Sequence, residues 1–399
     1  MTPPRSNRPH FTRPLLLVCC SLAVLAGCSD DDSGPTQPVP GSEDLAQGKQ
    51  TFRFDTFGDE SFWTDTLRMH EVIQAGVSPQ TALAVGLKVD ADALPPGTLE
   101  SADLTDPATT VALLKLDAVV GLKGTVQTIN GKDTLTAVGI TCALCHSTVN
   151  NSVAPGIGSR LDGWPNLDLD PGAIIALSPS LSAEQKAVYQ SWGPGKYDAR
   201  YNFDGRSDPA VLPPAYGLSG VHSVTYTGDG DRISYWNRFV AVTQMHGHGS
   251  FSEPRLGIAV SNPPDMVESK LADLEAYQLS LASPTPPSGS FDATAAARGR
   301  TVFTGAARCA ECHVGSTLTD ANTRLHQPSE VPTDPTHAER SATKMYRTTP
   351  LRALWQHAPY FHDGSAATLE DVVQRYDQFL GLGLTADQVA DLIEYLKSL

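Results

Sequence analysis

Two copies of the sequence C-x-x-C-H constrain this chain more than any other feature. They occupy residues 142–146 and 309–313, and they contain every cysteine that follows residue 28. Each copy places two thiols on one short turn, where both can form thioethers with one porphyrin while the adjacent imidazole binds its iron. In a chain of this composition, far less than one C-x-x-C-H motif is expected by chance. We therefore predict two covalent haems, attached and ligated through Cys142, Cys145, His146, Cys309, Cys312 and His313.

A structural zinc site built from the same cysteines is the alternative explanation of the two paired motifs. Zinc clusters of this kind belong mostly to reducing compartments. The N-terminus of this chain indicates export instead, which favours haem.

The N-terminus has the features of a bacterial lipoprotein signal. Several arginines precede an apolar stretch over residues 15–26, which is short for a membrane span, and residues 25–28 read Leu-Ala-Gly-Cys, like a lipobox. The pattern predicts a signal peptide over residues 1–27 and a lipidated Cys28. The acyl chains would hold the protein on the periplasmic side of a bacterial membrane. The alternative is a plain secretory signal or an uncleaved anchor. Both would also place the protein outside the cytosol.

The charge of the chain limits its partners. The formal net charge is −15, which argues against nucleic acid as a partner because phosphate backbones repel acidic proteins. An acidic surface would suit a small basic redox partner protein, such as a cytochrome or a cupredoxin. The alternative is that the negative net charge serves only to keep the protein soluble.

Breaker-rich segments divide the chain into parts. Residues 28–48 are acidic and rich in Pro, Gly and Ser, which predicts a flexible tether. A Pro-rich linker at 283–289 separates a first haem domain, 49–282, from a second one, 290–399. The predicted fold class is mainly α, with two cytochrome c-like domains of which the first is enlarged by a β-rich insertion.

The second half has the plan of a class I cytochrome c. A helix that carries Gly299 and Phe303 leads into the second motif, and a capping box at Thr385 begins a last helix with Leu392 and Tyr395. In that family the first and last helices cross closely, and Gly299 with Phe303 opposite Leu392 with Tyr395 resembles that contact. Glycine costs about 1 kcal/mol inside a helix, so its presence also favours a close approach. An incidental glycine is the alternative.

The first half mixes patterns. Residues 59–74 have helical spacing, and 82–89 and 111–120 have the composition of strands. Residues 125–138 predict a hairpin around Asn-Gly, the dipeptide that favours a type I′ turn. A capped helix is predicted over residues 265–281.

A family resemblance lies in the second half. Residues 347–354, 358–365 and 368–376 resemble the C-terminal domain of the bacterial di-haem cytochrome c peroxidase and MauG family, over about 290–399. In that family the haem of this domain transfers electrons, and its distal ligand, methionine or tyrosine, sits on the helix after a His-Asp-Gly turn. Tyr376 occupies that position, so the resemblance implies iron ligation by tyrosine.

The sequence does not decide which residue, if any, binds the distal side of each haem iron. Tyr376 also fits an ordinary core position, with Met345 or no side chain at the second iron. In the first domain the resemblance is weak, limited to residues 203–207, which are similar to the family's Trp-Asp-Gly-Arg sequence. The candidates for a ligand above the first iron are Met245, His246 and His248, then His222 and His70. His326 and His337 are expected in an exposed loop, and His357 and His362 are expected to pack on haem.

The resemblance implies an oxidoreductase. The haem at the second motif would receive electrons, and the haem at the first motif would reduce hydrogen peroxide through an open sixth position. The sequence identifies no catalytic acid or base for this step. The resemblance also raises a bridging calcium ion. The alternative is a non-enzymatic electron-transfer lipoprotein in which both irons have two protein ligands.

Overall fold

The computed structural model describes residues 41–399. The predicted signal peptide, the lipidation of Cys28 and the tether up to residue 40 lie outside the described residues. Within the described part, no helix combines the length and the apolar character that a membrane crossing requires.

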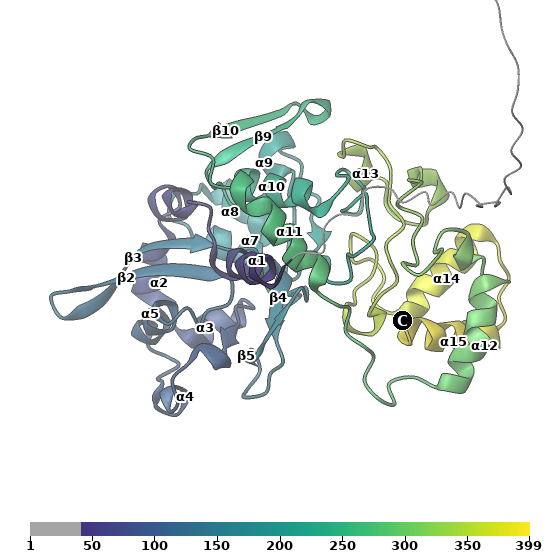
Figure 1. Ribbon diagram of the computed structural model, residues 1–399, viewed down its shortest axis with the longest axis horizontal. Helices are drawn as coiled ribbons and strands as arrows, with labels where there is room; N and C mark the ends of the chain where they lie inside the picture. The colour runs from purple at the N-terminus through teal and green to yellow at the C-terminus, as the bar shows by residue number, and fades with distance from the viewer. Residues whose placement is uncertain (1–40) are drawn as a thin grey trace, which may run out of the picture. The chain divides into compact units, whose positions relative to one another are not determined.

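The helices that begin and end the first part of the fold cross at a glycine. Helix α1 (Ser42–Phe54) packs on helix α11 (Leu271–Ser280), and the two lie together in Figure 1. A Cβ atom on Gly48 would lie 1.9 Å from the carbonyl oxygen of Asp273, so only glycine permits this approach.

This crossing corrects the predicted tether of residues 28–48. From Ser42 onward the chain is helical, and Gly48 is buried in a helix contact. Composition suggested a solvated segment because acidic residues and glycine dominate it. Among the described residues of this range, Glu43 and Asp44 occupy the first turn of α1, where they complement the helix dipole.

The second part repeats the arrangement. Helix α12 (Ala293–Thr304) crosses α15 (Ala386–Lys397), and a Cβ on Gly299 would lie 1.9 Å from a backbone carbonyl oxygen of α15. The rings of Phe303 and Tyr395 meet at 5.2 Å between centroids. The predicted contact between the first and last helices of this part is confirmed.

Both crossings follow one sequence pattern. A glycine is followed four residues later by phenylalanine, and the opposite helix carries aspartate followed four residues later by tyrosine, so these pairs share one helix face. The residues are Gly48, Phe52, Asp273 and Tyr277 in one pair, and Gly299, Phe303, Asp391 and Tyr395 in the other. Each C-x-x-C-H motif therefore lies between two helices that cross in this way, α1 and α11 for the first motif and α12 and α15 for the second.

A β-hairpin leads into the first motif. Strands β2 (Leu122–Ile129) and β3 (Lys132–Ile140) are antiparallel, with a register shift after Thr125. Asn130 and Gly131 both have positive φ, 52° and 77°, as a type I′ turn requires. The predicted hairpin is confirmed.

Two predicted strands are wrong. Residues 82–84 form the end of helix α3 (Pro79–Ala84), and only Val89 of that range is in a strand. Residues 111–115, half of the other range, lie in helix α5 (Pro107–Lys115). Each helix begins at a capping Ser or Asp that is followed by proline, a start signal that outweighs the β-branched residues inside it.

The mainly α fold class is confirmed, because the described strands are short and all precede residue 263. The other helices before the linker are η1 (Ser61–Thr66), α2 (Met69–Gly76), η2 (Ala91–Ala93), α4 (Thr98–Ser101), α6 (Ala143–His146), α7 (Pro171–Ala176), α8 (Ala183–Gln190), α9 (Tyr201–Asp204), α10 (Ile233–Thr243), η3 (Pro254–Leu256) and η4 (Glu268–Lys270). The other strands are β1 (Val89–Asp90), β4 (Ser147–Val149), β5 (Ile157–Gly158), β6 (Arg160–Asp162), β7 (Lys196–Tyr197), β8 (Ala210–Val211), β9 (Gly249–Glu253) and β10 (Ile258–Asn262). After the linker come η5 (Cys309–Glu311), η6 (Pro328–Glu330), α13 (Thr336–Glu339), η7 (Leu354–Gln356) and α14 (Leu369–Leu380).

The cores on the two sides of residues 283–289 are separate. The apolar clusters before this segment contain residues from 52 to 281, and the cluster after it contains residues from 302 to 399. The segment itself has no helix or strand. The exact domain boundaries stay predictions.

Arg340 joins the two sides across this segment. Its guanidinium pairs with Asp198 at 3.0 Å and with Asp204 at 2.7 Å, and the side chains of Arg340 and Asp198 are almost completely buried. Removing one partner of such a buried pair typically costs about 3–5 kcal/mol.

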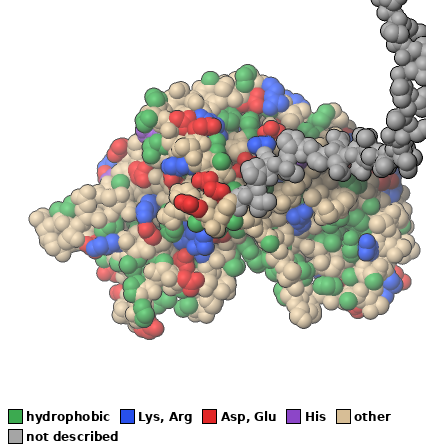
Figure 2. Space-filling model, in the orientation of Figure 1, with side chains coloured by type: hydrophobic (Ala, Val, Ile, Leu, Met, Phe, Trp, Pro, Cys, Tyr) green, Lys and Arg blue, Asp and Glu red, His purple; other side chains and the backbone are tan. Residues whose placement is uncertain are grey.

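Surface charges are mixed on the face that Figure 2 shows. Acidic and basic side chains of the described residues are interspersed there, without a continuous basic stripe of the kind that follows a phosphate backbone. The exclusion of nucleic acid as a partner stays a prediction.

Candidate functional site

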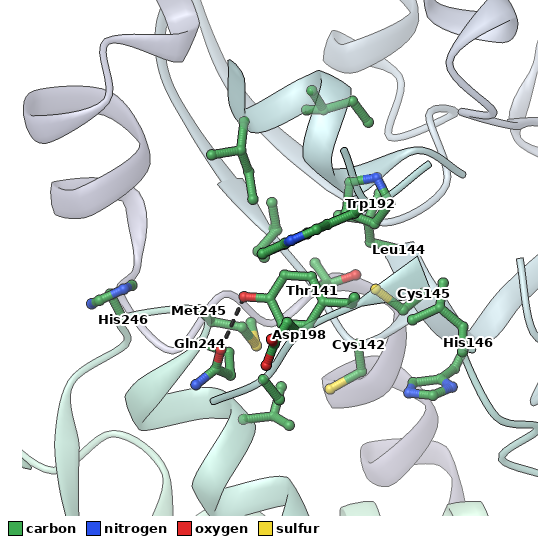
Figure 3. A pocket seen from close by; sticks show the side chains of 18 of the residues that line it. Thr141, Cys142, Leu144, Cys145, His146, Trp192, Asp198, Gln244, Met245 and His246 are labelled. Carbon is green, nitrogen blue, oxygen red and sulfur yellow. Dashed lines mark hydrogen bonds between the residues drawn. The ribbon is translucent and has the colours of Figure 1, made fainter. Parts of the chain in front are cut away.

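The first motif lines a cavity. Cys142, Cys145 and His146 lie on the wall of a largely apolar cavity of about 580 Å³, and Figure 3 shows their side chains together. Ligand sites in proteins commonly enclose about 300–1,000 Å³. The motif packs closely on the start of the hairpin, because a Cβ on Gly121 would lie 2.1 Å from the Cα of Leu144.

The imidazole of His146 is held in an orientation suited to a metal ligand. Its Nδ1 lies 3.1 Å from the carbonyl oxygen of Pro213. Donation from Nδ1 to this oxygen leaves the lone pair of Nε2 available for a metal. Desolvation lowers the pKa of His146 to about 4, so the ring is neutral at physiological pH.

The second motif lines a second cavity, of about 590 Å³, in the same way. Cys309, Cys312 and His313 lie on its wall. The Nδ1 of His313 lies 3.0 Å from the carbonyl oxygen of Leu318, and burial lowers the pKa of this histidine. The imidazoles of both motifs are thus oriented by a backbone carbonyl.

The four thiols fit thioether bonds better than a shared zinc site. The two pairs line different cavities, so they do not form one four-cysteine cluster. Burial raises the pKa of Cys142 and Cys145 to about 12 and that of Cys309 to about 11. A zinc site requires thiolates, which these surroundings disfavour, whereas a thioether carries no charge.

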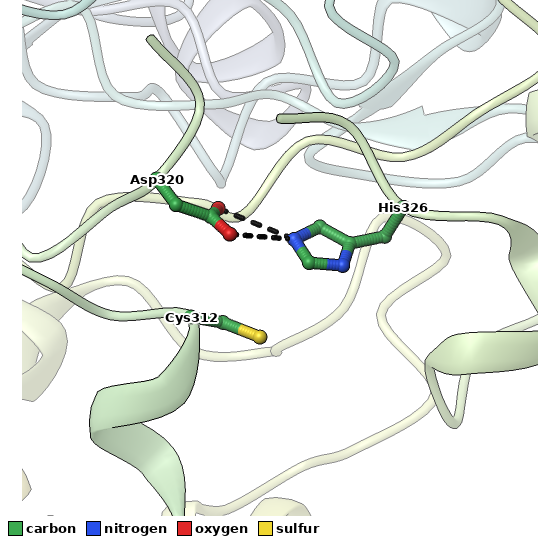
Figure 4. A group of neighbouring side chains, drawn as sticks. All are labelled: Cys312, Asp320 and His326. Atoms are coloured by element: carbon green, nitrogen blue, oxygen red, sulfur yellow. Dashed lines mark hydrogen bonds and ion pairs between the residues drawn. The ribbon is translucent and has the colours of Figure 1, made fainter. Parts of the chain in front are cut away.

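One group of side chains could hold a metal ion among the described residues. The ligand atoms of Cys312, Asp320 and His326 lie within 4.8 Å of one another (Figure 4), and His326 Nε2 is 3.0 Å from an Asp320 oxygen. A Cys312 sulfur in a thioether cannot serve as a thiolate. The group then reduces to a buried His–Asp pair beside the second cavity.

The expected exposure of His326 and His337 is wrong. His326 is 3% exposed because its backbone bridges to Tyr346 and folds the polar loop inward. His337 is half-buried and lines the first cavity, where Arg200 lies 3.2 Å from its Nε2. Loop composition gave no sign of these long-range contacts.

Two of the three main distal candidates line the first cavity. Met245 is almost fully buried there, and His246 stacks on Phe62 with ring centroids 3.7 Å apart. His248 does not line the cavity, and its Nδ1 lies 3.1 Å from the carbonyl oxygen of Pro263. The structure therefore separates residues that the sequence places within four positions.

The secondary candidates His222 and His70 line neither cavity. His222 is exposed and its backbone N–H donates to Asn322.

A polar pair in the first cavity was missed by sequence reasoning. The hydroxyl of Tyr197 donates to Gln244 Oε1 at 2.9 Å, and both side chains line the cavity. Burial raises the pKa of Tyr197, which keeps the hydroxyl protonated. The two residues come from β7 and from the end of α10, so no local pattern connects them.

Tyr376 lies where the resemblance implies, in the second cavity. It belongs to α14, whose N-terminus is capped by the Thr368 hydroxyl. Burial raises the pKa of Tyr376. His357 and His362 line the same cavity, whereas Met345 does not. Iron ligation by Tyr376 stays a prediction.

The two cavities share a wall. The shared residues include Pro213, whose carbonyl oxygen accepts from His146 and orients it, and two polar residues from distant segments, Tyr226 and Arg347. The shared residues are Val211, Leu212, Pro213, Pro214, Leu218, Tyr226 and Arg347.

A comparison with known protein families finds a match in the C-terminal part of the chain. Residues 296–399 match the cytochrome c family model. Among solved structures, hydrazine synthase from Kuenenia stuttgartiensis is 21% identical over 48% of this chain and 73% of its own, with a TM-score of 0.31. A MauG-like protein associated with microbial copper homeostasis is 22% identical over 49% of this chain and 74% of its own, with a TM-score of 0.34. No curated protein matches the chain.

Proposed function

We propose, starting from the cytochrome c domain that residues 296–399 form, that the whole chain is a di-haem c-type cytochrome with electron-transfer activity. The observation that carries the proposal is the pair of C-x-x-C-H cavities with one common wall. The cytochrome c domain holds haem c covalently and transfers electrons, and the proposal extends this to the first motif.

The construction of the first part supports a second haem there. The same glycine-dependent helix crossing closes both parts, and in both a backbone carbonyl orients the histidine of the motif. The first cavity is as large as the second. A part without a cofactor would have no physical reason to keep an apolar cavity of this size.

The common wall supports exchange of electrons between the two sites. Haem iron, when bound, supplies the one-electron chemistry. The chain brings the two sites together through the segment around Pro213, which holds His146 on one side and lines the second cavity on the other. Arg340 fixes the two parts against each other.

For the enzymatic function, we propose reduction of hydrogen peroxide in the first cavity. Tyr197 and Gln244 provide a hydrogen-bond donor and acceptor in apolar surroundings, where they would orient a small polar substrate and exclude competing water. The second site would receive electrons from a small redox partner protein. The resemblance of residues 347–376 to the di-haem peroxidase and MauG family supports this division of roles.

The alternative is an electron-transfer cytochrome without enzymatic activity. The position of Met245 favours it, because a buried thioether on the wall of the first cavity could fill a sixth coordination position. A bridging calcium ion, the lipid anchor at Cys28 and the periplasmic location remain parts of the proposal. Haem attachment outside the cytosol agrees with that location.

Electron paramagnetic resonance of the oxidised, full-length protein tests the proposal. We expect one high-spin signal, which peroxide changes after mixed-valence reduction, and one low-spin signal. The double variants Cys142→Ser/Cys145→Ser and Cys309→Ser/Cys312→Ser assign the signals, since each should remove one haem by mass. Two low-spin haems that ignore peroxide would establish the alternative, and a colourless wild-type protein would refute both functions.

A further inference from the structure

Arg347 stands at the wall between the two cavities. It is the only arginine or lysine of the described residues that lines both of them. Its backbone N–H donates to the carbonyl oxygen of Tyr226 at 2.9 Å, and the hydroxyl of Tyr226 donates to the carbonyl oxygen of Val211 at 3.2 Å. The backbone of Arg347 is therefore anchored at the wall by a residue of the first part.

The charge of Arg347 lacks a counter-ion among the described residues. Its Nε and Nη1 are buried and have no hydrogen-bond partner there. Burial lowers the pKa of Arg347 to about 10, so the side chain is still a cation at neutral pH. Burying a cation without an anion costs roughly several kcal/mol of free energy. An anionic ligand would remove this cost.

Other buried arginines of the chain have the carboxylate partners that Arg347 lacks. Arg340 pairs with Asp198 and Asp204, and Arg200 pairs with Asp229. In both cases carboxylates from another segment satisfy the guanidinium. Among the described residues, no carboxylate plays this part for Arg347, and burial outweighs the opposing effect of the Tyr226 hydroxyl on its pKa.

We propose that Arg347 binds a carboxylate of the porphyrin at the wall shared by the two cavities. This inference rests on the proposed di-haem function, because haem supplies two propionate groups inside a cavity of otherwise apolar character. The planar guanidinium presents parallel N–H donors that match both oxygens of a carboxylate. The two orphaned nitrogens, Nε and Nη1, lie on different edges of the guanidinium, and each edge is completed to such a pair by Nη2, so unpaired donors remain on both edges.

The position of Arg347 has a consequence for the redox properties. A fixed positive charge near an iron disfavours the further positive charge of the ferric state, so it raises the reduction potential. Because Arg347 borders both cavities, the same charge acts on both sites. Arg347 is thus a positioning residue that also sets the potential at which electrons pass.

Redox titration of the full-length holoprotein tests this inference, with Arg347→Gln and Arg347→Lys as variants. We expect Arg347→Gln to lower the midpoint potential of at least one haem, and Arg347→Lys to restore most of the wild-type value. Arg298→Gln is the matched control, because it removes the same charge from an exposed surface pair with Asp391, and it should leave both potentials unchanged. Wild-type potentials in Arg347→Gln with both haems attached would overturn the inference.

A second measurement applies where Arg347→Gln fails to mature. The resonance Raman band of propionate bending reports hydrogen bonding to the carboxylate, and we expect it to shift in Arg347→Lys. An unshifted band overturns the inference, as does a wild-type potential that depends on chloride, since a free anion would then be the ligand. Mass spectrometry separates the two proposals, because a wild-type chain without two haems refutes the di-haem function itself.

Discussion

At the scale of single residues, Asp59 shows how strongly burial changes a side chain. It is fully buried, one carboxyl oxygen has no partner among the described residues, and the other accepts a hydrogen bond from the Ile140 backbone at 3.2 Å. Desolvation raises its pKa from 3.8 to about 9. The folded state therefore holds this proton throughout the physiological range.

The shift of Asp59 predicts a dependence of stability on pH. Between pH 4 and 9 the unfolded chain has released the proton that the folded chain retains, so stability falls as pH rises through this window. Asp59→Asn should remove this part of the slope, since the amide is neutral and still accepts from Ile140. Chemical denaturation at several pH values measures the slope of the free energy of unfolding against pH. An unchanged slope, equal to that of the exposed control Asp65→Asn, would contradict the prediction.

Tyr376 gives a spectroscopic prediction. If its oxygen ligates the second haem, Tyr376→Phe removes the ligand and should convert the spectrum of that haem while leaving the haem of the first motif unchanged. Tyr360→Phe is a matched control, because Tyr360 lines the same cavity but its hydroxyl donates to the carbonyl oxygen of Leu354. Identical spectra for wild type and Tyr376→Phe would leave Tyr376 as a core residue.

The sequence predicted residues whose chemistry is local and missed those whose role depends on distant contacts. Cys142 and His146 follow from one short motif. Tyr197 and Gln244 meet only because β7 and α10 fold together, and their sequence separation carries no periodic signal. His326 was misjudged for the same reason, since its loop looks exposed until the bridge to Tyr346 is formed.

At the scale of helices and strands, strong terminal signals were more informative than internal composition. The hairpin turn at Asn130 and the capping box at Thr385 fix local geometry by themselves, and both predictions are confirmed. The strands expected over 82–89 and 111–120 rested on β-branched residues, which follow burial as much as backbone conformation. The tether prediction failed at Ser42 because composition cannot reveal a partner helix more than two hundred residues away.

The two helix crossings predict matched effects. Gly48→Ala and Gly299→Ala should each destabilise the protein by about 1–3 kcal/mol or more, because the new methyl group would overlap a backbone carbonyl. Gly76→Ala in α2 is the control, since its Cβ would meet nothing within 4 Å. Thermal unfolding of the three variants measures the difference. Equal stability of Gly76→Ala and Gly299→Ala would show that the helices can separate without cost.

At the scale of the whole molecule, the residues that join the two sides of the linker matter most. Arg340→Gln should cost about 3–5 kcal/mol because it leaves Asp198 buried without its cation. We expect calorimetry to show the cooperative transition splitting in two, as the separate cores unfold independently. Arg298→Gln should retain one transition. A single transition in Arg340→Gln would mean that apolar contacts alone join the two sides.

The order of elements along the chain affects how the cofactor can enter. In each part the opening helix and the cysteines are synthesised before the closing helix that locks the fold. If both motifs bind haem as proposed, an attachment enzyme would meet its substrate thiols before the domain is complete, with the cavity still accessible. Helix α11, and later α15, would then close each cavity over its haem.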